Sequence, residues 1–389
     1  MNTFNLKLLT LLFVSVTCLY FCSDKLNVFP ILMLGDSLTD SSILEYNNQP
    51  ISTIKKCQKI KNVAMVKTHK CAGDMMASLL LRFAENHKLE VLLPERPSSV
   101  VGYSMKPQFR IQNPSRLPNG KFQVMALHTM YNYNYWNSIM ETPFTLIGLT
   151  REPLSQFRSY FYYTREYFHG ENRIESKEEG LSTVLEQLQL LVKGDIKKID
   201  GFDARRYQNI MFVDFGGYDI KEDIDVTNYV QQISNNFSVL IVNEMFDESL
   251  VVLKNKLSWN WEDVVYQKMN VAKSSAMISF TQQEKEAHRL FSPKDYLLYE
   301  ESVKKLNKDI EKIKNFNEQL SEFKMLNKKV SSFCQNANTV NAAISHLFVK
   351  DVKYNCNGFF NITNFDCKKV SQGILQYVKF HIDQKEKYK

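Results

Sequence analysis

The sequence lacks the motifs of several common ligand-binding classes. It has no Gly-x-x-x-x-Gly-Lys-Ser/Thr segment, so the phosphate loop of ordinary nucleotide triphosphatases is not indicated. It has no Cys-x-x-Cys pair and no His/Cys spacing that suggests a zinc site. It has no dense basic stripe with interleaved aromatics, and its net charge is only +7, so we expect no nucleic-acid partner. This charge suits an anionic ligand or membrane headgroups instead.

Long hydrophobic runs are scarce as well. Residues 8–22 form one uncharged run of 15 residues after Lys7, and no other segment approaches the ~20 apolar residues of a membrane span. We predict a signal anchor: residues 1–7 are a cytosolic tail, residues 8–22 span a thin early-secretory membrane, and the rest is lumenal. A cleaved signal peptide is the alternative, although Cys22-Ser23-Asp24 is a poor cleavage site.

Glycosylation motifs and cysteines agree with a lumenal location. Asn-x-Ser/Thr triplets begin at Asn236 and Asn361, and glycosylation requires the secretory route. Of the seven cysteines, Cys18 and Cys22 lie in the apolar run and Cys71 lies in a basic loop. The four others are disulfide candidates: Cys57, Cys334, Cys356 and Cys367. They allow three pairings, which the sequence leaves open, and free buried thiols are the alternative.

A basic segment lies between a predicted strand and a predicted helix. Val63–Val66 is a short apolar run that predicts a buried strand. A helix is predicted from about Ala72, because apolar residues recur at helical spacing: Met76, Leu79, Leu80 and Phe83. Lys67-Thr68-His69-Lys70 lies between the two elements. Such a turn directs free N–H groups and the positive end of the helix dipole at one point, so we predict an anion site.

Strands that alternate with helices predict an α/β fold with a mostly parallel sheet flanked by helices. Further strands are predicted at 122–127, 144–149, 209–215 and 238–242. Helices are predicted from Pro153 and at 180–192, 248–257 and 284–326. Five prolines predict a loop over residues 94–118. Residues 23–60 are expected to be a stem, 61–330 the main domain and 331–389 a cysteine-containing C-terminal extension.

A second strand end carries matching chemistry. Arg151 follows the predicted strand 144–149, and Ser159 lies nearly two turns along the helix that Pro153 begins. An arginine fork and a serine hydroxyl both bind phosphate well. Because parallel strands end at one edge of a sheet, two anion sites there fit a nucleotide phosphorylated at both ends of its ribose.

Several segments, in the right order, resemble the Golgi galactose-3-O-sulfotransferases, the family that includes galactosylceramide sulfotransferase. The resemblance covers roughly residues 57–334 and rests on these pieces: Lys67–Lys70, Arg151–Pro153, Phe157 with Ser159–Tyr162, Phe212–Asp219 and Glu244–Leu250. It implies a P-loop-like sulfotransferase fold, with residues 61–330 as the catalytic domain. It also implies a single-pass type II protein of the Golgi membrane.

The resemblance implies a donor, an acceptor and residues that bind them. The donor co-substrate would be 3′-phosphoadenosine-5′-phosphosulfate (PAPS), with no metal. Arg151 and Ser159 would hold its 3′-phosphate. The acceptor would be the galactose 3-hydroxyl of a glycolipid or glycoprotein glycan, and an oligomeric state is left open. The 5′-phosphosulfate would be held by Lys67, Thr68 and Lys70 and by the backbone of Cys71, Ala72 and Gly73.

Sulfuryl transfer needs a cation and a base. Lys70 is our choice to stabilise the charge that builds on the leaving phosphate. A histidine suits removal of the acceptor proton. We prefer His128, which ends a predicted strand, over His69 in the loop itself. A hydrogen-bonded structural histidine is the alternative at either position.

Other side chains have sugar-binding chemistry but are expected to be structural. Tyr131, Tyr133, Tyr135 and Trp136 could stack on a sugar ring, yet core and surface positions are the commoner use of such residues. Glu244 and Asp247 could contact acceptor hydroxyls, and here too we rank a structural role first.

The loop departs from the family pattern in its second half. The family sequence Lys-Thr-His-Lys-Thr-Ala-Ser-Ser-Thr is rich in hydroxyls, whereas this chain has Cys71, Gly73 and Asp74, and Met130 replaces a frequent arginine. A weak or inactive relative that binds glycans or partners in the Golgi is therefore the alternative function. A kinase-like phosphotransferase ranks third, because no carboxylate cluster for magnesium accompanies the loop.

Overall fold

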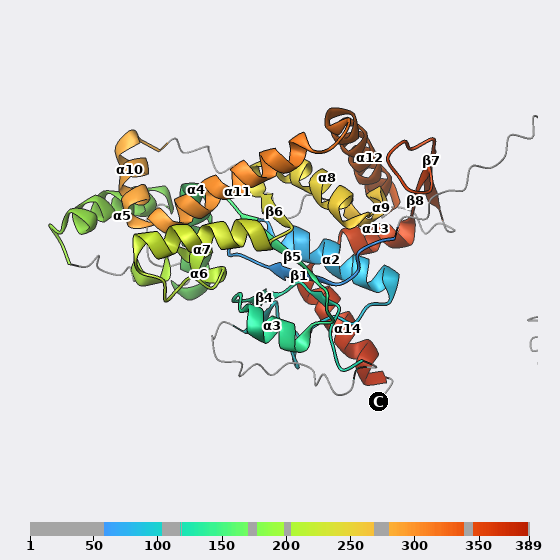
Figure 1. Ribbon diagram of the computed structural model, residues 1–389, viewed down its shortest axis with the longest axis horizontal. Helices are drawn as coiled ribbons and strands as arrows, with labels where there is room; N and C mark the ends of the chain where they lie inside the picture. Colours follow the sequence, from blue (N-terminus) through green and yellow to red (C-terminus); the bar gives the residue numbers. More distant parts are fainter. Residues whose placement is uncertain are drawn as a thin grey trace, which may run out of the picture. The chain divides into compact units, whose positions relative to one another are not determined.

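A computed structural model of the chain describes residues 58–102, 117, 119–169, 177–197, 204–267, 280–337 and 345–387. At its centre is a four-stranded parallel sheet in the order β3-β1-β5-β6 (Figure 1). Val63 pairs with Val124 on one side and with Thr145 on the other, and Ile147 pairs with Val239. The sheet strands are β1 (Val63–Val66), β3 (Val124–Met125), β5 (Thr145–Thr150) and β6 (Val239–Val242).

Helices follow the strands, as expected for a mixed α/β fold. The chain moves from β1 to β3 in one direction and from β5 to β6 in the other, so right-handed crossovers place the intervening helices on opposite faces. The helices up to β6 are α2 (Gly73–His87), α3 (Tyr133–Ile139), α4 (Pro153–His169), α5 (Lys177–Lys193), η3 (Ala204–Arg206), α6 (Ile210–Asp214) and α7 (Asp223–Asn236).

The segments after β6 complete the two layers. Helix α11 packs against β6, α7 and α8, and Figure 1 shows it running beside α7. Helix α9 packs against both α2 and α8. These later helices are η4 (Asn243–Met245), α8 (Phe246–Leu257), α9 (Trp261–Val264), α10 (Gln282–Phe291), α11 (Pro293–Glu311), α12 (Phe316–Ala337), α13 (Asn364–Val370) and α14 (Ile374–Lys387).

Close packing on β5 fixes where α6 lies. A Cβ at Gly148 would fall 2.5 Å from the ring of Phe215 and 2.9 Å from a methyl of Leu240. Only glycine therefore lets the Phe215 ring come so close to the middle of β5. Phe215 directly follows α6, so this contact holds the carboxyl end of that helix against the sheet.

Several sequence-based expectations about single elements were wrong. Residues 209–215 were expected to be a strand, but Ile210–Asp214 is helix α6. The proline-rich segment 94–118 contains a strand, β2 (Val100–Gly102), which pairs with β4 (His128–Thr129). The predicted strand 122–127 is reduced to β3, and the stretch 284–326 divides into three helices, α10, α11 and α12. The other predicted strands and helices are confirmed in place.

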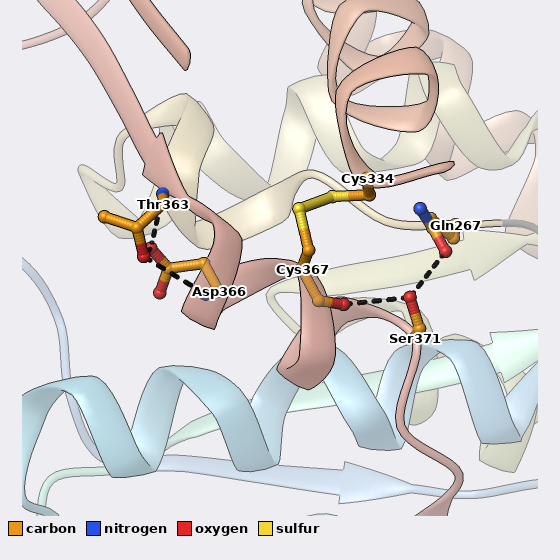
Figure 2. The surroundings of a disulfide bond; sticks show 6 residues. All are labelled: Gln267, Cys334, Thr363, Asp366, Cys367 and Ser371. Carbon is orange, nitrogen blue, oxygen red and sulfur yellow. Dashed lines mark hydrogen bonds between the residues drawn. A yellow bond between two sulfur atoms is a disulfide. The ribbon is translucent and has the colours of Figure 1, made fainter. Parts of the chain in front are cut away.

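The C-terminal segment shares the hydrophobic core of the sheet. Buried residues from α12, β8, α13 and α14 belong to the same cluster as the strands. Strands β7 (His346–Lys350) and β8 (Phe359–Thr363) form an antiparallel hairpin. Cys334 on α12 is disulfide-bonded to Cys367 on α13, beside the hydrogen bond from Ser371 to Gln267 (Figure 2). Cys356 is also disulfide-bonded, whereas Cys57 lies outside the described residues.

The predicted anchor and most of the stem lie outside the described residues, as do Cys18 and Cys22. Among the helices that the structure describes, none has the length and apolar content of a membrane span.

Candidate functional site

The basic loop lies at the carboxyl end of β1, whose neighbours in the sheet are β3 and β5. Lys67–Ala72 leads directly from β1 into the N-terminus of α2. Arg151 follows β5, and Asn243 and Glu244 follow β6. The three strand ends lie side by side in the sheet, so the residues after them form one edge. In open α/β sheets this edge is where ligands bind.

The loop backbone has the form of an anion-binding nest. Lys70 and Ala72 both have φ of 59°, in the left-handed region that non-glycine residues rarely adopt. Such strained residues cluster at ligand sites, and alternating left-handed residues turn successive N–H groups toward one point. Ala72 is the N-cap of the 15-residue helix α2, and its side chain makes no capping hydrogen bond. The N–H groups in the first turn of α2 therefore receive no acceptor from the N-cap side chain.

Lys67 lies under this nest and is paired with Asp74. Its side chain is only 3% exposed, and Nζ lies 3.0 Å from Oδ1 of Asp74, which is 56% exposed. Burial lowers the pKa of Lys67, and the nearby Asp74 carboxylate partly opposes that shift. A Cβ at Gly73 would fall 2.8 Å from Cγ of Lys67. Gly73 therefore makes room for the lysine stem, and the Asp74 carboxylate supplies the counter-charge.

Two side chains of the loop, those of Thr68 and Cys71, face the protein interior. The Thr68 hydroxyl donates to the carbonyl oxygen of Leu149 on β5 at 2.6 Å. The Cys71 thiol is fully buried and donates to the His69 carbonyl at 3.3 Å, and burial raises its pKa strongly. Both side chains donate to protein carbonyls and so help to hold the loop in shape.

His69 is oriented by a buried carboxylate from α6. Oδ2 of Asp214 accepts the backbone N–H of His69 at 2.8 Å and lies 2.7 Å from its Nδ1. The Asp214 side chain is 6% exposed and the His69 ring 15%. A carboxylate on Nδ1 fixes the tautomer and leaves Nε2 as the ring's basic nitrogen.

Asp295, at the start of α11, positions α6 and so Asp214. Its carboxylate accepts the N–H groups of Met211 at 3.3 Å and Phe212 at 2.8 Å. Burial raises the pKa of Asp295 to about 7. Asp214 also contacts the segment that follows β4, because its backbone carbonyl accepts the N–H of Tyr131 at 2.9 Å.

His128 lies against His69. The two rings are 5.0 Å apart between centroids. Burial lowers the pKa of His128 well below its usual value, and the charges of Lys67 and His69 lower it further. Tyr160 of α4 also packs on His69, with ring centroids 5.2 Å apart. The site thus holds two imidazoles, both of which the sequence predicted as candidate bases.

Arg151 joins the two predicted anion sites. Its Nη1 donates to the Lys70 carbonyl at 3.0 Å, so the two strand ends are in direct contact. Its buried Nε has no hydrogen-bond partner among the described residues and lies 4.0 Å from the Glu244 carboxylate. Glu244 accepts the N–H of Glu152 at 3.2 Å, which is a structural role. A buried guanidinium donor without an acceptor is what an anionic ligand would satisfy.

The remaining predicted ligand residues are Lys70, which contacts α4, and Ser159, which lies on α4. Nζ of Lys70 lies 4.3 Å from the ring centroid of Tyr163, so the lysine points along this helix. Ser159 is half-buried, four residues before Tyr163 on the same helix. Helix α4 starts at Pro153, and its first turn is capped by Glu152, whose carboxylate accepts the N–H groups of Leu154 and Ser155.

Sequence reasoning missed three residues that shape the site. They are Asp214, Gln156 and Asp295; Gln156 donates to the His69 carbonyl at 2.9 Å. Only Asp214 lay within a segment of the family resemblance, and the wrong strand prediction concealed it. The structure gives no sign of a metal site: the described residues contain no group of three or more His, Cys, Asp or Glu that could hold an ion.

Comparison with known proteins adds independent information. The family model described as galactose-3-O-sulfotransferase matches residues 1–373. The chain belongs to the galactose-3-O-sulfotransferase family. Similar relatives include galactose-3-O-sulfotransferase 2 of Mus musculus, 26% identical over 62% of this chain and 60% of that protein. Galactosylceramide sulfotransferase of Homo sapiens is 28% identical over 57% of this chain and 51% of that protein.

A third relative, galactose-3-O-sulfotransferase 3 of Homo sapiens, is 29% identical over 57% of this chain and 50% of that protein. This member of the galactose-3-O-sulfotransferase family thus spans about half to three fifths of the length of these relatives. No solved structure matches the chain.

Proposed function

We propose that this protein transfers a sulfuryl group from PAPS to the 3-hydroxyl of galactose on a glycolipid or glycoprotein glycan. The names of its relatives support the reaction class and the galactose acceptor. The observation that carries the proposal is the contact between Arg151 and the Lys70 carbonyl. This contact places the lysine-rich loop after β1 beside the arginine after β5. One donor with an anionic group at each end could then contact both.

The donor would lie across the carboxyl ends of β1 and β5. The N–H groups of residues 71–73, with Lys70 and with Lys67 beneath them, would hold the 5′-phosphosulfate. Arg151 and Ser159 would hold the 3′-phosphate, and the Nε–H of Arg151, which has no hydrogen-bond acceptor among the described residues, supports this part. This arrangement would make the fold P-loop-like in its chemistry, although the loop lacks the Walker sequence.

The reaction would be a direct displacement at sulfur. The acceptor oxygen forms a bond to sulfur while the bond from sulfur to the bridging phosphate oxygen breaks, and adenosine 3′,5′-bisphosphate leaves. Lys70 would stabilise the charge on that oxygen. The acceptor proton would pass to a histidine, worth about 10²–10⁴-fold in rate. The geometry favours His69 over His128, because Asp214 orients its ring and stabilises the cation that forms.

We also propose the cellular setting. Residues 8–22 would anchor the protein in the Golgi membrane as a single-pass type II protein, with residues 23–389 in the lumen. Glycosylation of Asn236 and Asn361 is consistent with this route, because both asparagines are exposed.

A labelled-sulfate transfer assay with the full-length chain and a panel of galactose-terminated acceptors tests the proposal. We expect transfer by the wild type, and its loss in Lys70→Ala but not in Lys350→Ala, a matched exposed lysine on β7. Full activity of Lys70→Ala would refute the assigned role. The inactive-relative alternative predicts donor or glycan binding without turnover. The phosphotransferase alternative predicts magnesium-dependent transfer that a chelator stops.

His69→Gln and His128→Gln separate the two candidate bases. We expect the larger fall in kcat from His69→Gln, with the donor KM little changed, because this residue would act only in the transition state. A larger fall from His128→Gln would return the assignment to that residue.

A further inference from the structure

A cavity of about 910 Å³ opens at the other end of the sheet. It is lined by Phe144 and Leu146 at the start of β5 and by Phe237 and Ser238 just before β6. The loop at Lys67–Gly73 follows the carboxyl end of β1. Because β1, β5 and β6 are parallel, the cavity at the amino ends of β5 and β6 lies at the opposite edge of the sheet from this loop. Its volume is in the range of about 300–1,000 Å³ that is common for ligand pockets.

The cavity lining suits a neutral, hydroxyl-rich molecule. None of the described residues that line it is charged. Its tyrosines are Tyr131, Tyr133 and Tyr229, and its side-chain amides come from Asn132, Asn137 and Gln232 besides Asn236. Tyrosine rings offer apolar faces, and amides offer both donors and acceptors for sugar hydroxyls. Tyr133 is 53% exposed although its neighbour Trp136 is fully buried, so its ring is presented to solvent at the cavity.

A glycosylation motif forms part of the cavity wall. Asn236 is the last residue of α7, is exposed and lines the cavity together with Phe237 and Ser238 of its own motif. Phe237 is fully buried, and the N–H of Ser238 donates to the Leu146 carbonyl at 3.0 Å. The backbone next to Asn236 is therefore held in place, so any sugar attached there starts at the cavity mouth.

We propose that the N-linked glycan of Asn236 folds back into this cavity, with its first sugar residues packed on Tyr133. The attachment is ordinary N-glycosylation: the Asn236 amide nitrogen forms a bond to C1 of the first sugar and loses a proton. A lipid-linked diphosphate leaves from that carbon. The molecule in the cavity is thus the glycan attached to Asn236, and the cavity binds this glycan rather than a substrate. The proposal rests on the lumenal location proposed above.

The second motif provides an internal control. Asn361 lies on the hairpin strand β8, is exposed and does not line the cavity. A glycan on Asn361 starts away from this cavity, so it should be accessible to enzymes. The two sites can be compared within one molecule, which removes differences in expression and folding.

The test is release of each glycan from the native full-length protein by peptide-N-glycosidase, followed by mass spectrometry of the two peptides. We expect release at Asn236 to be at least about tenfold slower than at Asn361. Tyr133→Ala and, separately, Gln232→Ala should speed release at Asn236 and leave Asn361 unchanged. Both side chains are exposed, so neither substitution removes core packing.

Equal release rates in the wild type, or no effect of either substitution, would overturn the proposal. An unmodified Asn236 beside a modified Asn361 would overturn it and leave the lumenal location standing. If neither asparagine is modified in a cell that glycosylates secreted proteins, the cavity proposal and the lumenal location both fall.

Discussion

Asp74→Asn tests how the unusual second half of the loop affects donor binding. Asp74 lies in the first turn of α2, and its carboxylate is 3.0 Å from the buried Lys67 ammonium. In the proposed complex this carboxylate would face the donor phosphosulfate. The substitution removes one negative charge at the anion site and frees Lys67 to contact the donor. We therefore expect tighter binding of adenosine 3′,5′-bisphosphate.

The size of the gain follows from charge and exposure. At an effective dielectric constant of about 20 and a separation of about 6 Å, one full charge contributes about 3 kcal/mol. The Asp74 side chain is 56% exposed, so solvent screening reduces this to about 1 kcal/mol, or roughly fivefold in Kd. Without Asp74, the pKa of Lys67, already lowered by burial, falls further. The gain should therefore shrink as the pH rises and Lys67 loses its proton.

Calorimetric titration of the full-length protein measures this effect. Asp223→Asn is the matched control, because it removes an exposed aspartate from the first turn of α7. Both substitutions lose a favourable helix-dipole contact, but only Asp74→Asn changes the anion site. The reasoning fails if Asp74→Asn binds no tighter than the wild type at neutral pH, or if both variants shift Kd equally.

Two further substitutions probe the support of His69. Asp214→Asn should lower kcat by about 10²-fold or more with a small change in donor KM, because His69 loses the carboxylate that orients it; unchanged steady-state kinetics would contradict this. The melting temperature of Asp295→Asn relative to the wild type should rise progressively between about pH 4 and pH 7 and then level off. Burial raises the pKa of Asp295 in the folded state to about 7 from 3.8. In the wild type, the folded state therefore keeps a proton that the unfolded state has lost, and this stabilisation disappears as the pH rises toward 7. A difference that does not vary with pH would count against this.

Local patterns were enough to locate the loop and its arginine. Val63–Val66 is a continuous apolar run, so burial on both faces follows from its composition. Pro153 marks the start of α4 and thereby places Arg151 at a strand end. Each of these inferences depends on a few adjacent residues, and the structure has the elements where the sequence placed them.

The support of the site depends on contacts far apart in the sequence. The apolar run in residues 209–215 is compatible with a strand, but the Asp295 carboxylate binds its N–H groups as a helix N-terminus. That partner lies more than 80 residues away, so no local pattern reveals it. Likewise β2 exists because Val100 pairs with His128, across a segment whose prolines predict a loop.

The central claim is that one doubly charged nucleotide bridges the Lys70 loop and Arg151. Calorimetry with adenosine 3′,5′-bisphosphate and with adenosine 5′-monophosphate, which lacks the 3′-phosphate, tests it directly. We expect Lys70→Ala to weaken both ligands. Arg151→Ala should weaken the bisphosphate by roughly 10- to 100-fold, as for loss of a charged hydrogen bond, and leave the monophosphate nearly unchanged. An Arg151→Ala protein that stays folded and loses affinity equally for both nucleotides would contradict the account.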